Sequence, residues 1–390
     1  MLKLFSGIVL LALAIPVARP SGLAAATGEP APIVTDYKLL DPITHGDLTI
    51  FPVVSSKSYD TGGFLTLDEG IRSGEVVVTE VGNLHSAIER RPLPQSYRGG
   101  AQVNTLVLVN NSERPLILLA GEIVTGGKQD RVVAKDRIVP AESDPVDLGV
   151  FCVEPHRWVD KSYKFDTHAS VMAQPSVRKK AMAEKDQQQV WAEVNNARTN
   201  MANSIMGAPP TASGGAGGLG SGAGHPGVPS NGATTRVLAQ LDSTSSYAVA
   251  RENSAVEKQV EAITEPMQKS YESLIKQLRN QNAVGVVVAV KGRIVWADLF
   301  ASSNLLGKYW PKLLQSYAAE ALTTPGASGD LSIKDAQRFL ENWQANHETV
   351  DSEPGLYRQR ELVGDRFRAF ELTSLLPKAA FDVHLSKMAD

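Results

Sequence analysis

Residues 115–131, with the sequence PLILLAGEIVTGGKQDR, join an apolar run to a polar glycine turn. The run of leucine, isoleucine and valine side chains is typical of a buried β-strand. A buried strand that ends in a charged glycine turn gives a rigid scaffold on which a site can be presented. We therefore expect the functional centre here, in Glu122 and in the turn residues Gly126, Gly127, Lys128, Gln129, Asp130 and Arg131.

The segments around this stretch predict several short strands in the first half. We expect residues 103–109 and 116–125 to pair as a hairpin across the turn 110–115, whose composition is Asn, Ser and Pro-rich. Further strands are predicted at 48–54, 75–81, 131–133, 137–140 and 146–153, with a short helix at 64–72 that ends at Gly74. Pro52 indicates an edge position or a bulge in its strand.

The second half alternates helical and β patterns. Helices are predicted at 176–205, 255–280, 302–321 and 333–346, and Pro311 should kink the third of these or mark a boundary. Residues 284–299 predict a hairpin around Lys291-Gly292, and 356–363, 366–372 and 381–386 predict a meander. The fold class is α+β, with an antiparallel β-rich core, as a sheet or a sandwich, covered by helices.

The composition divides the chain into four segments. Residues 1–26 carry Lys3, an apolar core at 8–18 and the small residues 24–26, which predicts a signal peptide, with an uncleaved anchor as the alternative. Residues 27–206 form a β-rich N-terminal half that ends in a helix. Residues 207–235, rich in Gly, Ala, Pro and Ser, predict a flexible, disordered insertion. Residues 236–390 form an α+β half that we expect to share one composite domain with the first.

Export to the periplasm or the medium follows from the signal peptide, and no transmembrane segment is expected after its cleavage. The net charge is −3, without a long basic run, which argues against nucleic acid as a partner.

Cys152 is the only cysteine, so an intramolecular disulfide and a cysteine-based zinc site are excluded. We expect Cys152 to be a buried core thiol. No metal site is predicted, and the sequence identifies no cofactor.

The turn at 126–131 has side chains that suit an anionic ligand. Gly126 and Gly127 allow close backbone approach, and Lys128 and Arg131 can bind phosphate or carboxylate. Glu122 can act as a general base, bind a metal ion or pair with Arg131. The alternative is a solvated hairpin tip with surface ion pairs.

A second cluster follows a predicted strand at residues 152–158, CVEPHRW. Glu154, Arg157 and Trp158 combine an acid, a bidentate cation and a stacking surface, which suits a sugar or a nucleobase. The alternative is a structural Glu–Arg pair beside a core tryptophan. The aromatic residues of the later hairpin are expected in the core. Asp298, at a strand end among them, is the one polar residue there that is a candidate for a functional role.

Gly121-Glu122 with the turn 126–131, and Cys152-Val153-Glu154 with Arg157-Trp158, resemble the ARG and rhodanese-phosphatase superfamily-associated protein domain family, as does the segment 287–298. The resemblance spans most of the chain and implies no assigned activity. The family's companions include ADP-ribosylglycohydrolases, which implies ADP-ribose or nucleotide chemistry. Members often have glycine where this chain has His156, and Asn-Gly where it has Lys291-Gly292.

Three functions stay open from the sequence. The favoured one is an exported protein that binds a small polar, anionic, sugar-like or nucleotide-like ligand through Lys128, Arg131, Arg157 and Trp158. The second is a hydrolase of a glycosidic or ADP-ribose-type bond, with Glu122 and Glu154 as acid and base, which requires the two carboxyl groups to share a pocket. The third is a structural or interaction module with a protein partner.

Overall fold

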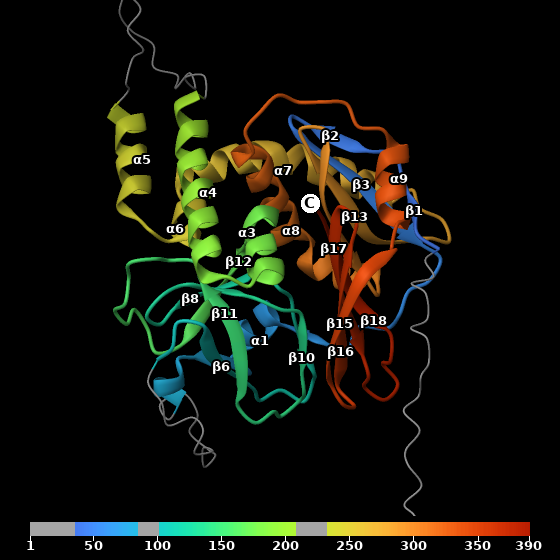
Figure 1. The fold of residues 1–390 in the computed structure, drawn as a ribbon, viewed down its shortest axis with the longest axis horizontal. Coiled ribbons are helices and arrows are strands. Elements are labelled where there is room, and N and C mark those ends of the chain that lie inside the picture. The colour runs from blue at the N-terminus through green and yellow to red at the C-terminus, as the bar shows by residue number, and fades with distance from the viewer. Residues whose placement is uncertain (1–35, 85–100, 208–231) are drawn as a thin grey trace, which may run out of the picture. The chain divides into compact units, whose positions relative to one another are not determined.

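The computed structural model describes residues 36–84, 101–207 and 232–390 (Figure 1). Residues 36–390 form one compact unit. The predicted signal peptide, residues 1–26, lies outside the described residues. So do residues 208–231 of the predicted insertion, whose two ends belong to helices α4 and α5.

The largest sheet has nine strands and is antiparallel, in the order β1-β3-β13-β14-β18-β17-β16-β15, with β2 also pairing with β3. Strand β3 from the N-terminal half therefore lies against β13 from the C-terminal half, blue beside orange in Figure 1. The bounds are β1 Lys38–Leu39, β2 Ile43–His45, β3 Leu48–Ser55, β13 Asn282–Val290, β14 Arg293–Phe300, β15 Ala345–Glu353, β16 Tyr357–Gly364, β17 Phe367–Ser374 and β18 Asp382–Ala389.

Pro52 lies inside this sheet rather than at its edge. Its strand β3 pairs with β13 on one side, where Pro52 lies opposite Val286. On the other side, Pro52 lies opposite the segment between β1 and β2, where its oxygen accepts a hydrogen bond from the amide of Leu40 at 2.9 Å. The missing N–H of proline costs little at a position where ladder pairing is interrupted.

The N-terminal half also builds two smaller sheets. One has six strands in the order β12-β8-β9-β11-β6-β5, and the other has three in the order β10-β7-β4. The bounds are β4 Leu65–Thr66, β5 Val76–Thr79, β6 Thr105–Asn110, β7 Leu116–Leu118, β8 Glu122–Gly126, β9 Arg131–Val133, β10 Arg137–Val139, β11 Val146–Cys152 and β12 Phe165–Met172. Apart from the parallel pair β4 and β7, the strand pairs are antiparallel.

The predicted hairpin between residues 103–109 and 116–125 is wrong. Strand β6 pairs with β5 and β11, whereas β7 pairs with β4 and β10. The stretch 116–125 is divided at Gly121, which has a φ of +96°. This left-handed backbone sends β7 and β8 into different sheets, and only glycine adopts it at little cost.

The later hairpin and the C-terminal meander are confirmed. Strands β13 and β14 are joined by Lys291 and Gly292, with φ values of +51° and +72°. Two successive positive φ values define the hairpin turn type that favours Asn-Gly, and Lys291 takes the first of the two positions here. Strand β15 was not predicted, and residues 342–346 of the predicted helix at 333–346 are not helical.

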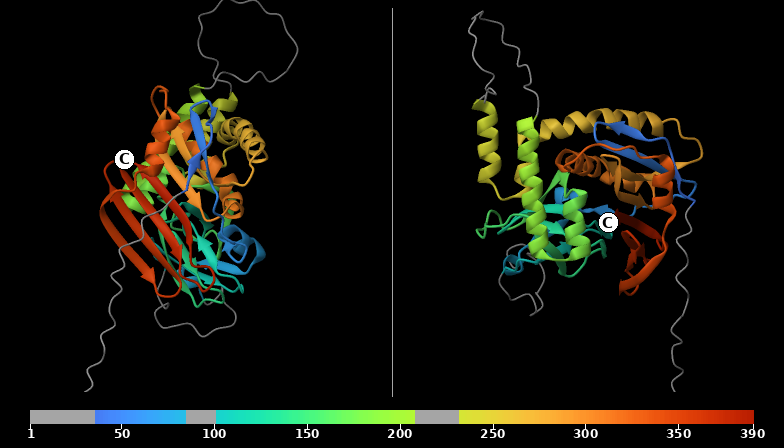
Figure 2. Two further views of the ribbon diagram at one scale, coloured as in Figure 1. Left: turned by 90° about the vertical axis from the view of Figure 1, so that its right-hand side faces the viewer. Right: turned by 45° about the horizontal axis from the view of Figure 1, so that its top comes forward.

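Helices cover the sheets, as Figures 1 and 2 show for α4, α7 and α8. The predicted helix at 176–205 is interrupted: α3 runs into a π-helical turn at Lys180–Glu184 and ends at Lys185, with a φ of +53°. Helix α8 continues through Pro311.

None of the described helices is both long and apolar enough to cross a membrane. The α-helices are α1 Leu67–Ser73, α3 Pro175–Lys179, α4 Gln187–Gly207, α5 Gly232–Ser243, α6 Tyr247–Arg251, α7 Ser254–Ile275, α8 Ser303–Thr323 and α9 Ile333–Glu341, with a 3₁₀ turn at Val81–Asn83.

Two hydrophobic clusters make up most of the core. The larger one joins residues of both halves, such as Ile50 and Ile123 with Tyr309 and Leu372. The smaller one lies within the N-terminal half and extends from Leu65 to Phe165. The antiparallel strands and packed helices confirm the predicted α+β class with a β-rich core.

Substitution of Gly285 tests how closely β13 packs against β14. A Cβ atom at this position would lie 2.3 Å from the carbonyl oxygen of Asp298. We expect Gly285→Ala to lower the free energy of unfolding by about 3 kcal/mol, because backbone atoms must shift. Gly149→Ala, at an exposed glycine in β11 with no atom within 4 Å of a Cβ, is the matched control. Equal urea midpoints for both variants and wild type would contradict this packing.

Candidate functional site

The glycine turn connects β8 to β9 and needs both of its glycines. Gly126 and Gly127 have φ values of +130° and +45°. A Cβ atom on Gly127 would lie 2.3 Å from the ring of Phe165, and one on Gly126 would lie 2.5 Å from Ser162 Oγ. The turn is closed by Asp130, whose Oδ1 accepts a hydrogen bond from the Gly126 amide at 3.2 Å.

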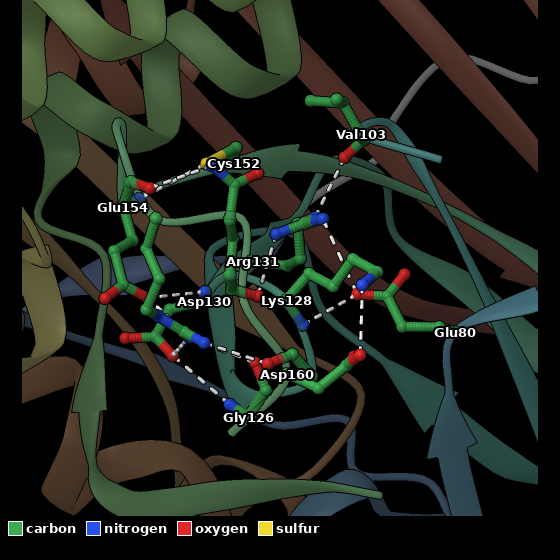
Figure 3. A network of polar contacts seen from close by, with 12 residues as sticks. Glu80, Val103, Gly126, Lys128, Asp130, Arg131, Cys152, Glu154 and Asp160 are labelled. Carbon is green, nitrogen blue, oxygen red and sulfur yellow. Dashed lines mark hydrogen bonds and ion pairs between the residues drawn. The ribbon is translucent and has the colours of Figure 1, made fainter. Parts of the chain in front are cut away.

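Arg157 holds this turn from the neighbouring loop. Its Nη1 donates to the oxygen of Gly127 at 2.8 Å, and its Nη2 donates to the oxygen of Gly126 at 3.2 Å. The same guanidinium pairs with Glu154 at 2.6 Å and with Asp130 at 3.4 Å. Glu154 also accepts from the Asp130 amide at 3.0 Å. The two predicted clusters are thus one network, shown in Figure 3.

Arg131 supports the turn from inside the protein. Its side chain is fully buried, and it donates to the carbonyl oxygens of Val103 at 2.8 Å and Gln129 at 2.7 Å. Glu80 lies 3.8 Å from its Nη2 and accepts from the Lys128 amide at 3.0 Å (Figure 3). Burial lowers the pKa of Arg131 and raises the pKa of Glu80. The attraction between the two charges opposes both shifts without cancelling them.

The second half of the chain contacts the same network. Ser246 Oγ donates to Asp130 Oδ2 at 2.6 Å, and the amide of Tyr247 donates to the oxygen of Val153 at 3.0 Å. Burial and the neighbouring Glu154 raise the pKa of Asp130. Cys152 is buried, as predicted, and burial raises the pKa of its thiol.

The outer face of the network presents Trp158, which is 44% exposed. Lys128 Nζ lies 6.0 Å from the centroid of its ring and 3.0 Å from Asp160 Oδ2. Val159 and Tyr163, on the same loop, are 71% and 68% exposed. The exposed part of the site is therefore an aromatic surface beside a lysine–aspartate pair, and the alternative of a core tryptophan at 158 is wrong.

His156 has a φ of +75° within this loop. The left-handed region is the one in which glycine is favoured, so His156 adopts a backbone conformation that glycine would adopt at lower cost.

Glu122 lies in a different set of contacts. It is 1% exposed, accepts from the Leu119 amide at 2.8 Å and pairs with Lys312 of α8. Lys312 also pairs with Asp68 at 2.7 Å. Burial raises the pKa of Glu122, the charge of Lys312 opposes this shift, and the nearby Asp68 carboxylate adds to it. The two predicted carboxylates, Glu122 and Glu154, are thus held by different cations.

A buried charge network was missed in the sequence, although Asp298 was noted. His384 Nδ1 lies 2.6 Å from Asp136, and its Nε2 lies 3.1 Å from Asp298. Arg178 pairs with Asp298 through two hydrogen bonds of 2.9 and 3.2 Å. These four side chains, which we call the buried charge quartet, are fully buried. Tyr317 donates a further hydrogen bond to Asp298.

The quartet is electrically balanced when His384 is protonated. Although burial opposes it, the charges of Asp136 and Asp298 raise the pKa of His384 to about 9. Burial also acts on Asp298 and raises its pKa, but the hydrogen bonds and positive charges of Arg178 and His384 outweigh this effect, so the pKa of Asp298 is lowered. Two cations and two anions then neutralise one another in the core, which is the condition under which buried charges are tolerated.

In the described part of the chain, no group of three or more His, Cys, Asp or Glu side chains is arranged to hold a metal ion.

Arg157→Lys tests the role of the guanidinium in the turn. A lysine supplies one point charge, so the carbonyls of Gly126 and Gly127 and the carboxylate of Glu154 cannot all keep a donor. We expect the free energy of unfolding to fall by about 1–3 kcal/mol. Arg338→Lys, at an ion-paired arginine on α9 that is 77% exposed, should change it by less than about 0.5 kcal/mol. Losses of similar size in both variants would contradict the assigned role.

The quartet predicts a pH-dependent stability. Because the pKa of His384 rises to about 9 on folding, its contribution is fully present below about pH 6.5 and is lost as the pH rises through about 9. Denaturant unfolding of wild type and His384→Gln should diverge most at low pH, with a difference that changes by up to about 1.4 kcal/mol per pH unit.

The difference between the two proteins isolates His384, since other groups titrate in both. In wild type, NMR should also show the His384 imidazole protonated at pH 7.5. A neutral imidazole at that pH, with exposed His347 as the internal comparison, would contradict the balanced quartet.

Comparison with models of protein families matches residues 36–388 to the ARG and Rhodanese-Phosphatase-superfamily-associated Protein domain. No curated protein and no solved structure matches the chain.

Proposed function

The chain belongs to the ARG and Rhodanese-Phosphatase-superfamily-associated Protein domain family, and we propose that it binds a polar, anionic ligand with a ring, a sugar or a nucleotide. The proposed site is the outer face of the loop at 156–164 together with Lys128. As part of this proposal, residues 1–26 direct the protein to the periplasm or the medium, where it meets this ligand.

The observation that carries the proposal is the exposed Trp158 beside the Lys128–Asp160 pair. An indole face packs against the C–H face of a sugar or against a nucleobase. The ammonium and the carboxylate next to it supply a donor and an acceptor for hydroxyl groups at the ring's edge. This combination needs no rearrangement of the buried network.

The buried network supports binding because it fixes the loop in advance. Arg157 bonds the turn at 126–127 and also donates to the oxygen of Val159 at 2.8 Å. A loop held in this way loses little conformational entropy when a ligand binds. Arg131 and Arg157 are thus proposed to act through the loop, and Lys128 and Trp158 to touch the ligand.

The charge around Trp158 favours an anionic ligand. Lys161 and Lys164 are exposed on the same loop, with Lys128 on the neighbouring turn. Asp160 is the one acidic side chain between residues 156 and 164, all of which the structure describes. A local excess of cations attracts phosphate and carboxylate groups.

The contacts favour binding over hydrolysis. Glu154 is paired with Arg157, and Glu122 is 1% exposed and paired with Lys312. A general acid or base must reach the bond that it cleaves. Hydrolysis with these two carboxylates would require both ion pairs to open, whereas binding at Trp158 uses side chains that are already at the surface.

Trp158→Ala tests the site directly. We expect a thermal-shift screen of the mature protein against sugars, nucleotides and ADP-ribose to give a ligand, whose affinity is then measured by calorimetry. Trp158→Ala and Lys128→Ala should each weaken binding by about tenfold, which corresponds to about 1.4 kcal/mol. Val350→Ala, at an exposed valine of β15 outside this loop, should leave the affinity unchanged.

Two outcomes would overturn this proposal. One is a ligand whose affinity is the same for wild type and Trp158→Ala, which would place binding elsewhere. The other is a screen in which no sugar or nucleotide binds wild type, which would favour a protein partner for the exposed surface of Val159 and Tyr163.

A further inference from the structure

One edge of the nine-stranded sheet is formed by β15, which is the outermost strand on its side of the sheet (Figures 1 and 2). Among the described residues, β15 pairs with β16 on one side and with no strand on the other. Residues 346–353 are all exposed. Successive residues of an antiparallel strand point their N–H and C=O groups to alternate sides. Every second residue of β15 therefore presents an amide and a carbonyl that another strand can bind.

The acidic side chains of this edge are already neutralised within the chain. Charges on an exposed edge normally repel a second edge and so protect the protein from pairing. Each of the three acidic residues of β15 instead has a cation beside it: Glu348 has Arg360, Asp351 has Lys135 and Glu353 has Arg137. The first of these pairs has two hydrogen bonds, of 2.8 and 3.1 Å. The repulsion between two such edges is therefore weakened.

We propose that β15 is a dimer interface, at which two copies of this chain pair their β15 strands antiparallel about a two-fold axis at Val350. Val350 lies at the centre of the stretch 347–353 and is 51% exposed. The axis is perpendicular to the sheet, so the two nine-stranded sheets continue into one another. The two-fold axis closes the assembly at two chains, because each β15 edge is then covered by the other.

The alternation of side chains restricts the possible registers. Residues directly opposite each other in a continuous sheet point to the same face, and side chains alternate between faces along each strand. The two-fold axis must therefore pass through a residue rather than between two residues. An axis at Glu348 or at Asp351 would place that carboxylate opposite its own copy, which is destabilising.

The remaining central registers have their axis at Thr349 or at Val350. An axis at Thr349 places the carboxylate of Glu348 opposite the apolar side chain of Val350. An axis at Val350 places the two valines opposite each other, and His347 opposite Glu353 of the second copy. A β-branched pair and an imidazole that donates to a carboxylate are both favourable cross-strand pairs. The register centred on Val350 is therefore the one that the side chains favour.

The interface is a small one. Only residues 347–353 of each strand face each other in it, which is less surface than a permanent dimer buries. We therefore expect a reversible dimer whose population depends on concentration. This inference does not depend on the ligand proposed above, because β15 lies outside the loop at 156–164.

Sedimentation equilibrium over a dilution series tests whether the dimer forms. The mass of wild type should rise from that of one chain to that of two as the concentration increases. Val350→Lys places two ammonium groups opposite each other, and we expect it to raise the dissociation constant about tenfold or more. Val249→Lys, at a valine of α6 that is 42% exposed, is the matched control and should leave the dissociation constant unchanged.

Disulfide trapping tests the register. The two Cα atoms at position 350 would lie about 4.5–5.5 Å apart, which suits a disulfide, so Val350→Cys should give a covalent dimer on mild oxidation. Ser352→Cys is the control. Residue 352 lies opposite residue 348 of the second copy, so the two new cysteines would be about 14 Å apart, too far to be joined. Cys152 is buried and is the same in both variants.

Three results would overturn the proposal. The first is wild type that stays monomeric up to about 1 mM, which leaves too little free energy for a specific dimer. The second is a dimer that Val350→Lys does not weaken, which would place the interface elsewhere on the chain. The third is equal trapping of Val350→Cys and Ser352→Cys, which would show random collision rather than a fixed pairing of the two strands.

Discussion

The buried charge quartet is the interaction on which the rest of the structure depends. Asp136 comes from the loop after β9, Arg178 from α3, Asp298 from β14 and His384 from β18, and all four side chains are fully buried. Each charge would be expensive in the core on its own, and each is stabilised by partners from distant parts of the chain. Only the folded arrangement of both halves brings the four together, so the quartet makes the folding of either half depend on the other.

The stretch at residues 115–131 contacts the quartet and also contributes to the Glu122–Lys312 pair and to the network around Arg157. The amide of Ala120 donates to Asp136 at 2.7 Å, which ties the stretch to the quartet. A Cβ atom at Gly121 would lie 2.6 Å from Arg178 Cγ, so this glycine makes room for the arginine. Glu122 pairs with Lys312, and the turn at 126–131 is held by Arg157. The same segment thus joins the core to the loop that presents Trp158.

The sequence predicted the parts of this arrangement that depend on neighbours along the chain. The hairpin of β13 and β14 followed from two strand-like runs joined by the Lys291-Gly292 turn. The glycine turn and the Glu154–Arg157 segment were singled out for their polar side chains, but as two separate clusters, and the contacts that join them were not predicted. Strand β15 was missed because its sequence is polar and its side chains are largely exposed, so it carries no apolar alternation. The quartet was missed because its members are separated by 42, 120 and 86 positions, from 136 to 178 to 298 to 384. Pairing of buried charges is decided by tertiary contacts that no local pattern contains.

The most direct test of the central claim is native-state hydrogen exchange at increasing urea, followed by mass spectrometry on wild type. If the quartet and the shared core couple the two halves, peptides from β6 and β11 and peptides from β13 and β14 will become exchangeable in one global opening, with the same free energy and the same urea dependence. Exchange of the six-stranded sheet at lower urea, while the nine-stranded sheet stays protected, would contradict the account and show two independently stable halves.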